Sequence, residues 1–225
     1  MPSFRNPASE TAAADALGAE EGAALPLDNV VPCFTPGTVI ATPAGEKRVE
    51  DLRVGDRVLT RDNGLQEIRW TGSCRLGAET LREAPALRPV RIRSGALDHG
   101  LPEADILVSP WHNVLIQNDK AARFFEDGEV LAAAGHLTSM EGVEVVDVPS
   151  VTYVHFMFDR HEVVLSNGFW TESFRPDDQV MNSLGQRQRR QILNLFPELR
   201  DTEGRRAYKA ARRPLSEAES RLLLD

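Results

Sequence analysis

The most informative segment of the chain runs Cys33-Phe34-Thr35-Pro36-Gly37-Thr38-Val39-Ile40-Ala41-Thr42-Pro43-Ala44-Gly45. Its β-branched residues favour a strand over Thr38–Thr42, and Pro43-Ala44-Gly45 is a turn signal. A cysteine that only packs in the core would normally lie within such a strand, whereas Cys33 precedes it. This position suits a nucleophile that attacks its own upstream amide, Pro32–Cys33, once that amide is twisted or protonated.

The composition is that of an ordinary globular protein. The chain has 225 residues, 41% hydrophobic and 27% charged residues, and a net charge of −8. That length can bury a core without metal or disulfide staples, and two cysteines alone make neither a disulfide framework nor a zinc site. We therefore predict no metal and no cofactor. The acidic balance argues against nucleic-acid binding, and no apolar run reaches the ~18 residues that a membrane span needs.

Charge and composition divide the chain into three parts. Residues 1–32 carry one arginine against five acidic residues and are rich in alanine, which predicts a flexible acidic leader. Alanine and glutamate favour a short helix over Thr11–Gly22 within it. Residues 33–176 are predicted to form the β domain. Residues 177–225 are predicted to form a helical C-terminal extension, in which residues 184–213 hold nine basic and three acidic residues.

Short runs of β-branched and aromatic residues predict many strands in the middle of the chain. Asp62-Asn63-Gly64 and Asn167-Gly168 are hairpin turn signals. The helical signal returns only after Asp177, over Gln179–Phe196 and over Ser216–Leu223, where Ser216 is a predicted N-cap. The predicted strands after the first are Lys47–Leu52, Asp56–Thr60, Gln66–Thr71, Val90–Arg93, Asp105–Val108, Asn113–Ile116, Val143–Val148, Thr152–Phe158 and Glu162–Leu165.

A second chemical segment lies between two apolar strands and contains Ser109-Pro110-Trp111-His112. A tight turn there would let a hydroxyl and an imidazole grip one amide from two sides. His112 is the candidate that protonates the departing amide nitrogen, and Ser109 is the candidate that orients the scissile group.

A third segment, residues 153–168, places histidines within apolar strands. His155 alternates with Tyr153 and Met157, so the three side chains share one face. A histidine near Cys33 can take the thiol proton, because the thiolate is the nucleophile. The supporting candidates are His161, Thr38 and Asp159.

Together these segments resemble the Hint module shared by hedgehog autoprocessing domains and inteins, and more narrowly the bacterial Hint-domain proteins that open with Cys-Phe-Thr-Pro-Gly-Thr. The resemblance covers about residues 31–200. It implies an all-β, horseshoe-like, pseudo-twofold domain in which Cys33 makes an N-to-S acyl shift. Ser109-Pro-Trp-His112 is similar to the family's Thr-x-x-His motif, which implies that His112 protonates the amide.

The family's third block carries an Asp or a Cys that assists the first cysteine. Aligned on the Asn167-Gly168 turn, His155 takes that position; aligned on the block's own histidine, His161 matches and Val154 takes it. We prefer the first register, because it supplies an ionisable residue. Inteins end this block with His-Asn, and the Asn cyclises. Here the positions read Glu172-Ser173, which cannot form a succinimide, so splicing is not expected.

The resulting hypothesis is autoprocessing. Cys33 attacks the Pro32 carbonyl, and water or a thiol then releases residues 1–32, which are the protein's own substrate. One alternative is a non-catalytic Hint-like β domain that serves binding or secretion. Another is a Cys/His hydrolase that acts in trans, which needs an open pocket around Cys33.

Other residues carry less chemical information. Cys74 has no partner motif, although a Cys33–Cys74 disulfide would silence the nucleophile. The C-terminal arginine clusters are expected to be solvated helix faces, or to pair with the acidic middle of the chain. The N-terminus lacks a signal-peptide core. That favours a cytoplasmic location, with export by a non-classical route as the alternative.

Overall fold

The computed structural model describes residues 31–126 and 128–224. Residues 1–30, which hold most of the predicted leader and its predicted helix over Thr11–Gly22, lie outside the described residues. The strands are β1 (Val39–Thr42), β2 (Gly45–Arg48), β3 (Arg57–Thr60), β4 (Gly64–Glu67), β5 (Trp70–Gly77), β6 (Val90–Ile92), β7 (Ile106–Val108), β8 (Asn113–Ile116), β9 (Val130–Ala133), β10 (Val143–Val145), β11 (Ser150–Met157), β12 (Val163–Ser166), β13 (Phe169–Glu172) and β14 (Arg213–Pro214). The helices are α1 (Ala78–Glu83), α2 (Asp119–Phe124), α3 (Asp178–Ser183), α4 (Gln186–Leu195), α5 (Thr202–Ala207) and α6 (Glu217–Arg221).

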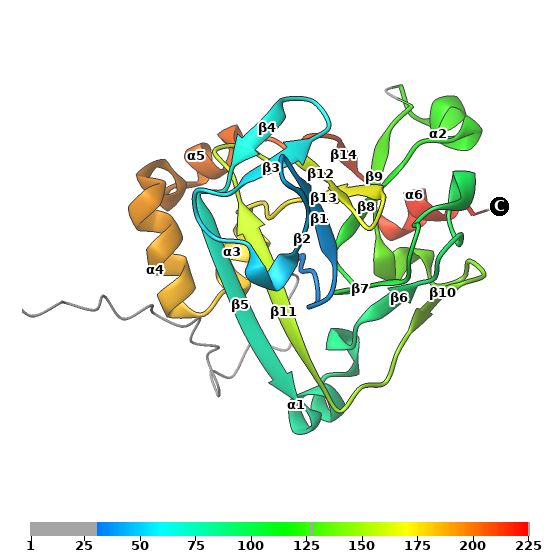
Figure 1. The fold of residues 1–225 in the computed structure, drawn as a ribbon, viewed down its shortest axis with the longest axis horizontal. Coiled ribbons are helices and arrows are strands. Elements are labelled where there is room, and N and C mark those ends of the chain that lie inside the picture. Colours follow the sequence, from blue (N-terminus) through cyan, green and yellow to red (C-terminus); the bar gives the residue numbers. More distant parts are fainter. Residues whose placement is uncertain (1–30, 127, 225) are drawn as a thin grey trace, which may run out of the picture.

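The described strands form one large sheet, one small sheet and one long ribbon (Figure 1). The large sheet runs β14-β9-β8-β13-β12-β1-β2, with the β3–β4 hairpin attached to β12. The small sheet has the order β10-β6-β7, and β5 and β11 pair along their full length as an antiparallel ribbon. Strands fill the middle of the chain and helices its C-terminal part, which confirms the predicted all-β class with a helical C-terminal extension.

Both predicted hairpin turns are confirmed by their backbone geometry. Asn167 and Gly168 have φ of 44° and 78°, so both central residues of the β12–β13 turn are left-handed, as a type I′ turn requires. Gly64 has φ of 63° at the β3–β4 turn. Ser216 caps α6 in a capping box with Glu219, as predicted.

Some element predictions were wrong. The predicted strand over Lys47–Leu52 ends at Arg48, and Val49–Asp51 is a 3-10 turn that buries Val49. The Val49 N–H makes the last bond toward the β1 side, to the Thr38 carbonyl at 2.8 Å, and the Leu52 N–H then donates to the Val49 carbonyl at 3.3 Å, which closes the 3-10 turn. Strand β9 has no apolar–polar alternation because all four of its residues are buried. The sequence pattern therefore did not predict it, and β13 was also not predicted.

The helical predictions also need correction. Helices α1 and α2 precede Asp177, and each is only six residues long with one buried residue, too short for a periodic apolar signal. The predicted continuous helical stretch over Gln179–Phe196 is two helices. The chain is extended at Leu184, with ψ of 145°, so α3 ends there and α4 starts anew.

The segment before β1 joins the ribbon to the small sheet. The Phe34 main chain bridges Val108 of β7 on one side and Val154 of β11 on the other. Helix α4 lies along β5, where the Gln188 side chain donates to the Ser73 carbonyl at 2.9 Å (Figure 1). The chain entering the domain is therefore enclosed by β7, by the ribbon and, behind the ribbon, by α4.

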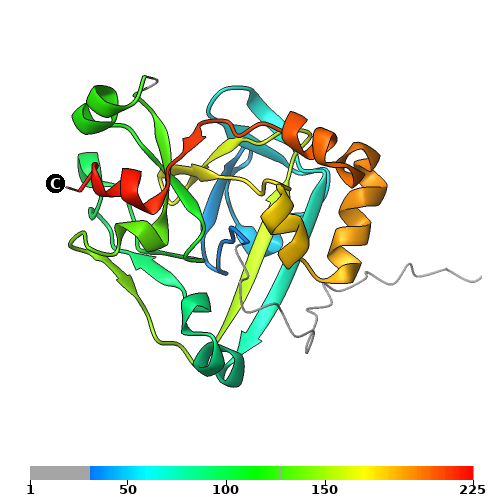
Figure 2. The ribbon, with the colours of Figure 1, turned by 180° about the vertical axis from the view of Figure 1, so that it is seen from behind.

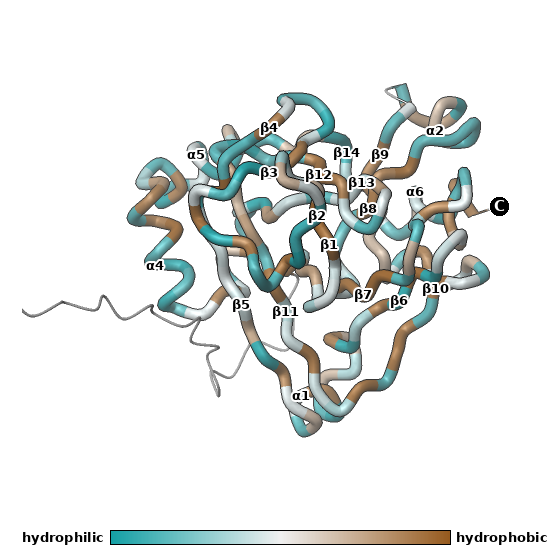
Figure 3. Tube along the Cα trace, viewed as in Figure 1, coloured by the Kyte–Doolittle hydropathy of each residue, from teal (hydrophilic) through white to brown (hydrophobic). Residues whose placement is uncertain are grey.

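Apolar residues concentrate on the inner strands, whereas the β3–β4 turn is hydrophilic (Figure 3). One apolar cluster is formed mainly by buried side chains of the large and small sheets, and it includes Phe34, Val108 and Phe156. A second cluster includes Cys33 and Trp70 and lies against α3 and α4. Cys33 is thus placed in an apolar environment at the junction of the two clusters.

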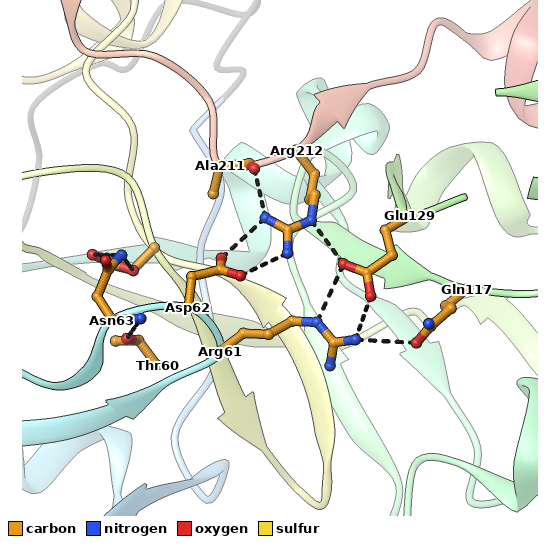
Figure 4. Close-up of polar contacts among 9 residues, drawn as sticks. Thr60, Arg61, Asp62, Asn63, Gln117, Glu129, Ala211 and Arg212 are labelled. Atoms are coloured by element: carbon orange, nitrogen blue, oxygen red, sulfur yellow. Dashed lines mark hydrogen bonds and ion pairs between the residues drawn. The ribbon is translucent and has the colours of Figure 1, made fainter. Parts of the chain in front are cut away.

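Residues 208–215 form a segment that we name the C-terminal strap, which crosses the back of the domain from α5 to β14 (Figure 2). Arg212 donates to Asp62 and to Glu129, at 2.7 Å each (Figure 4). For this arginine, the expectation that the basic extension pairs with the acidic middle is confirmed. Within the described part of the chain, no helix has the length and apolar character needed to cross a membrane.

Candidate active site

The main chain around Cys33 is held on both sides. The Phe34 N–H donates to the Val154 carbonyl at 2.8 Å, and the Val154 N–H donates back at 2.9 Å. The Ser109 N–H donates to the Cys33 carbonyl at 2.9 Å. Only 4% of Cys33 is exposed. The Pro32–Cys33 peptide therefore enters a buried, hydrogen-bonded position.

We name Cys33, Ser109 and His155 the cysteine cluster. The Cys33 N–H donates to Ser109 Oγ at 2.9 Å, and the Ser109 hydroxyl donates to the Val31 carbonyl at 2.9 Å. Cys33 Sγ lies 3.4 Å from His155 Nδ1 and 3.3 Å from the Val31 carbonyl oxygen. One hydroxyl thus holds the peptide groups on both sides of Pro32, and an imidazole nitrogen lies beside the thiol.

The ribbon shapes a slot for the His155 ring. Trp70 stacks on this ring at 5.1 Å between centroids, and Phe174 lies at 5.5 Å. Gly72 is paired with His155 in the ribbon, and a Cβ there would lie 2.7 Å from His155 Nε2. Glycine at position 72 leaves the room the ring needs. His155, and not Val154, is thus the residue of β11 whose side chain lies beside Cys33.

Burial keeps the groups of the cysteine cluster uncharged. It raises the pKa of the Cys33 thiol well above its ordinary value and lowers the pKa of His155 to about 4. The Ser109 hydrogen bond lowers the thiol pKa, but by less than burial raises it. At neutral pH the resting site therefore holds a thiol and a neutral imidazole.

We name His112, Asn113, His161 and Glu172 the carboxylate cluster. Glu172 Oε1 accepts the Asn113 main-chain N–H at 2.9 Å and its side-chain amide at 2.8 Å. His161 Nε2 lies 3.3 Å from Glu172 Oε2. Burial acts to raise the pKa of the Glu172 carboxyl, yet the hydrogen bond from His161, the nearby imidazoles of His161 and His112 and the Asn113 N–H together outweigh it and hold the pKa below its usual value.

His112 is a buried imidazole in the predicted turn. Its main-chain N–H donates to the Ser109 carbonyl at 3.0 Å, and its ring packs against Phe34 at 4.3 Å between centroids. Among the described residues, neither ring nitrogen has a hydrogen-bond partner. Burial lowers the pKa of His112 to about 4, although the Glu172 carboxylate acts in the opposite direction.

The three supporting candidates, His161, Thr38 and Asp159, lie in different environments. His161 belongs to the carboxylate cluster, whereas Thr38 is structural: it is buried, and its carbonyl accepts the Val49 N–H. Asp159 has a side chain that is 71% exposed and lies 3.3 Å from Arg69 Nε, so it is not brought to Cys33. Sequence reasoning missed Glu172 as a charged member of the site. The available signal was a carboxylate at the end of the otherwise uncharged run Phe169–Glu172.

The described residues hold neither a metal-ligand group nor a disulfide at the site. In residues 31–126 and 128–224, no three His, Cys, Asp or Glu side chains are grouped so that they could hold a metal ion. Cys33 and Cys74 are not joined by a disulfide. The chemical groups at the site are thus a thiol, a hydroxyl, imidazoles and a carboxylate.

The fold and the buried cysteine at its entrance define the class of protein, a hedgehog/intein-type β domain. The family model described as "Hint domain" matches residues 32–178, and the chain belongs to this family. The matched range starts one residue before Cys33. It ends six residues after β13, at the first residue of α3.

The solved structures that this chain resembles are distant in sequence. The crystal structure of the gp41-1 intein has 16% identity and a TM-score of 0.38, covering 62% of this chain and 97% of its own. The solution structure of a bacterial intein-like domain from Clostridium thermocellum has 16% identity and a TM-score of 0.41, covering 63% and 97%. No curated protein matches the chain.

Proposed function

We propose that this domain cleaves its own chain at the Pro32–Cys33 bond through an N-to-S acyl shift. The observation that carries the proposal is the cysteine cluster, in which the Cys33 N–H is held by Ser109 and the thiol lies beside His155. The amide and the nucleophile are already held next to each other, so the reaction does not have to bring them together, and this lowers the entropic part of the barrier. Membership of the Hint family supports the same type of chemistry.

In the proposed step, a bond forms between Cys33 Sγ and the Pro32 carbonyl carbon, and the bond from that carbon to the Cys33 nitrogen breaks. The thiol proton leaves toward His155 Nδ1, and the nitrogen gains one proton to become a free amine. His112, which rests neutral and must first take up a proton from solvent, is the proposed donor of that proton, and the proton held by His155 returns to solvent. Water or an external thiol then attacks the thioester, which releases residues 1–32 and restores the Cys33 thiol.

The proposed reaction stops at this cleavage and does not continue to splicing. Glu172 and Ser173 stand where an intein carries His-Asn, and neither side chain can form the succinimide by which an intein's Asn releases the downstream segment. The Ser173 N–H donates to the Glu162 carbonyl at 2.8 Å, and its hydroxyl accepts the Glu162 N–H at 3.0 Å. These bonds support a structural role for Ser173.

A second candidate function is a non-catalytic β domain. The observation that favours it is burial, which disfavours both the thiolate of Cys33 and the imidazolium forms of the two site histidines. The same burial argues against a hydrolase acting in trans, because Cys33 is only 4% exposed.

The deciding experiment uses the full chain. Purified protein is incubated with dithiothreitol or hydroxylamine at neutral pH, and intact mass and N-terminal sequencing are measured. We expect a fragment that begins at Cys33, with no such fragment from Cys33→Ala and an unchanged yield from the matched variant Cys74→Ala. Wild-type protein that keeps its native circular dichroism spectrum and its intact mass would instead support the non-catalytic domain.

A further inference from the structure

Glu172 is a buried carboxylate with an unusual set of partners. It is 2% exposed and accepts two hydrogen bonds from Asn113. Among the ion pairs of the described residues, its only partner is His161. Whether the charge of Glu172 is neutralised therefore depends on the protonation state of His161.

The C-terminal strap settles the protonation of His161. The Ala211 main-chain N–H donates to His161 Nδ1 at 2.9 Å. A main-chain N–H can only donate, so Nδ1 must keep its lone pair and the ring carries its single hydrogen on Nε2. That hydrogen points at Glu172 Oε2, at 3.3 Å, and at the Ser173 carbonyl, at 3.2 Å. His161 therefore donates a hydrogen bond without supplying a positive charge.

Ala211 is held in place by its neighbours along the C-terminal strap. Arg212 is clamped between Asp62 and Glu129 (Figure 4). The Tyr208 hydroxyl donates to the Phe158 carbonyl at 2.8 Å. The strap is thus fastened to the β domain on both sides of the Ala211 N–H, which makes the contact with His161 a fixed feature of the fold.

The uncompensated charge of Glu172 lies next to His112. The carboxylate binds the main-chain N–H of Asn113, the residue that follows His112. The titratable groups whose charge acts on His112 are Glu172 and His161, and the Phe34 ring packs against the His112 ring at 4.3 Å between centroids. With His161 neutral, Glu172 is the group that can stabilise a positive charge on His112.

We propose that Glu172 is the charge partner of His112, and that the C-terminal strap preserves this role by holding His161 as the neutral Nε2–H tautomer. The inference rests on the proposed function in one respect, that His112 protonates the departing nitrogen. Glu172 and His161 are then positioning residues. A buried carboxylate near an imidazole raises the protonated fraction by about tenfold or more, since it favours the charged form.

The first test uses wild-type full-length protein with ¹⁵N-labelled histidine. Long-range ¹⁵N–¹H spectra distinguish the two neutral tautomers and the imidazolium. We expect His161 to show the Nε2–H tautomer at pH 7. A His161 ring protonated on Nδ1 at that pH would overturn the proposal.

The second test compares Glu172→Gln with Glu162→Gln. Glu162 is also buried and adjoins His161, but it binds Asn63 and not Asn113, so it is a matched control. We expect the titration midpoint of His112 to fall by about one pH unit in Glu172→Gln and to stay in place in Glu162→Gln. Thiol-induced cleavage should slow about tenfold in the first variant and less than twofold in the second.

The cleavage assay and the His112 titration distinguish a failure of the proposed cleavage from a failure of the Glu172–His112 partnership. If wild-type protein does not cleave, the proposed function fails, and the His112 titration still decides the pairing with Glu172. If wild-type protein cleaves while Glu172→Gln changes neither the titration midpoint nor the rate, the proposed function stands and the charge partnership is wrong.

Discussion

The cysteine cluster and the carboxylate cluster hold their buried polar groups in different ways. In the cysteine cluster, Ser109 ties the main chain together and the thiol and imidazole stay neutral. In the carboxylate cluster, Glu172 stays ionised because N–H groups replace the water it has lost. The cysteine cluster thus fixes the main chain at the Pro32–Cys33 peptide bond, and the carboxylate cluster holds a buried negative charge on Glu172.

This difference matches two requirements of the proposed acyl shift. The nucleophile must be held close to its target, which needs only hydrogen bonds and packing. The departing nitrogen must be protonated, which needs a charge to favour an imidazolium in an apolar interior. A domain that kept only the cysteine cluster would have the geometry without the acid.

The largest expected effect comes from removing the Phe34 ring, which packs against His112 of the carboxylate cluster. Phe34 is 2% exposed, and its ring contacts both His112 and Phe156. Phe34→Ala should lower the free energy of unfolding by about 4 kcal/mol, because a buried ring leaves a cavity. Urea denaturation measures this. Phe124→Ala, at a ring that is 48% exposed, is the control and should cost well under ~1 kcal/mol. Similar losses in both variants would contradict the packing role.

Acid should destabilise the domain through its buried histidines. The pKa of His112 and that of His155 are about 4 in the folded protein, against 6.5 ordinarily. Between these values the unfolded chain binds protons that the native state does not, so stability falls as the pH falls from 6.5 toward 4. At pH 5 each histidine contributes a loss of about 2 kcal/mol relative to pH 8.

Single variants assign that loss to each cluster. The free energy of unfolding is measured in urea at pH 8 and pH 5 for wild type, His112→Asn and His155→Asn. Each variant should lose about 2 kcal/mol less than wild type between the two pH values. An identical pH dependence in all three proteins would show that neither imidazole is buried in its neutral form.

The smallest effect concerns the hydroxyl at position 109. Ser109→Ala should cost about 1.5 kcal/mol, because the buried Cys33 N–H loses its acceptor and the Val31 carbonyl loses one of its two donors. Ser109→Thr keeps the hydroxyl and should recover most of that stability and of the thiol-induced cleavage rate. Equal stability of the alanine and threonine variants would argue against the bridge.

Local sequence signals predicted a large share of this protein. Gly64, Asn167 and Gly168 adopt left-handed backbone at the two turns, and such signals act within a few residues. The strand over Asn113–Ile116 and the cap at Ser216 were predicted for the same reason. Cys33, His112 and His155 could be singled out because their residue types and positions are unusual for packing alone.

The parts of the site that the sequence did not predict depend on contacts between residues that are far apart in the chain. The Ser109 hydroxyl meets Cys33 across 76 residues, and the Ala211 N–H meets His161 across 50. Glu172 read locally as a lost splicing residue, and its role as a buried anion emerges only when β13 pairs beside β8 and the C-terminal strap closes over His161. A residue's chemistry in a core depends on which donors surround it, and those donors come from distant parts of the chain.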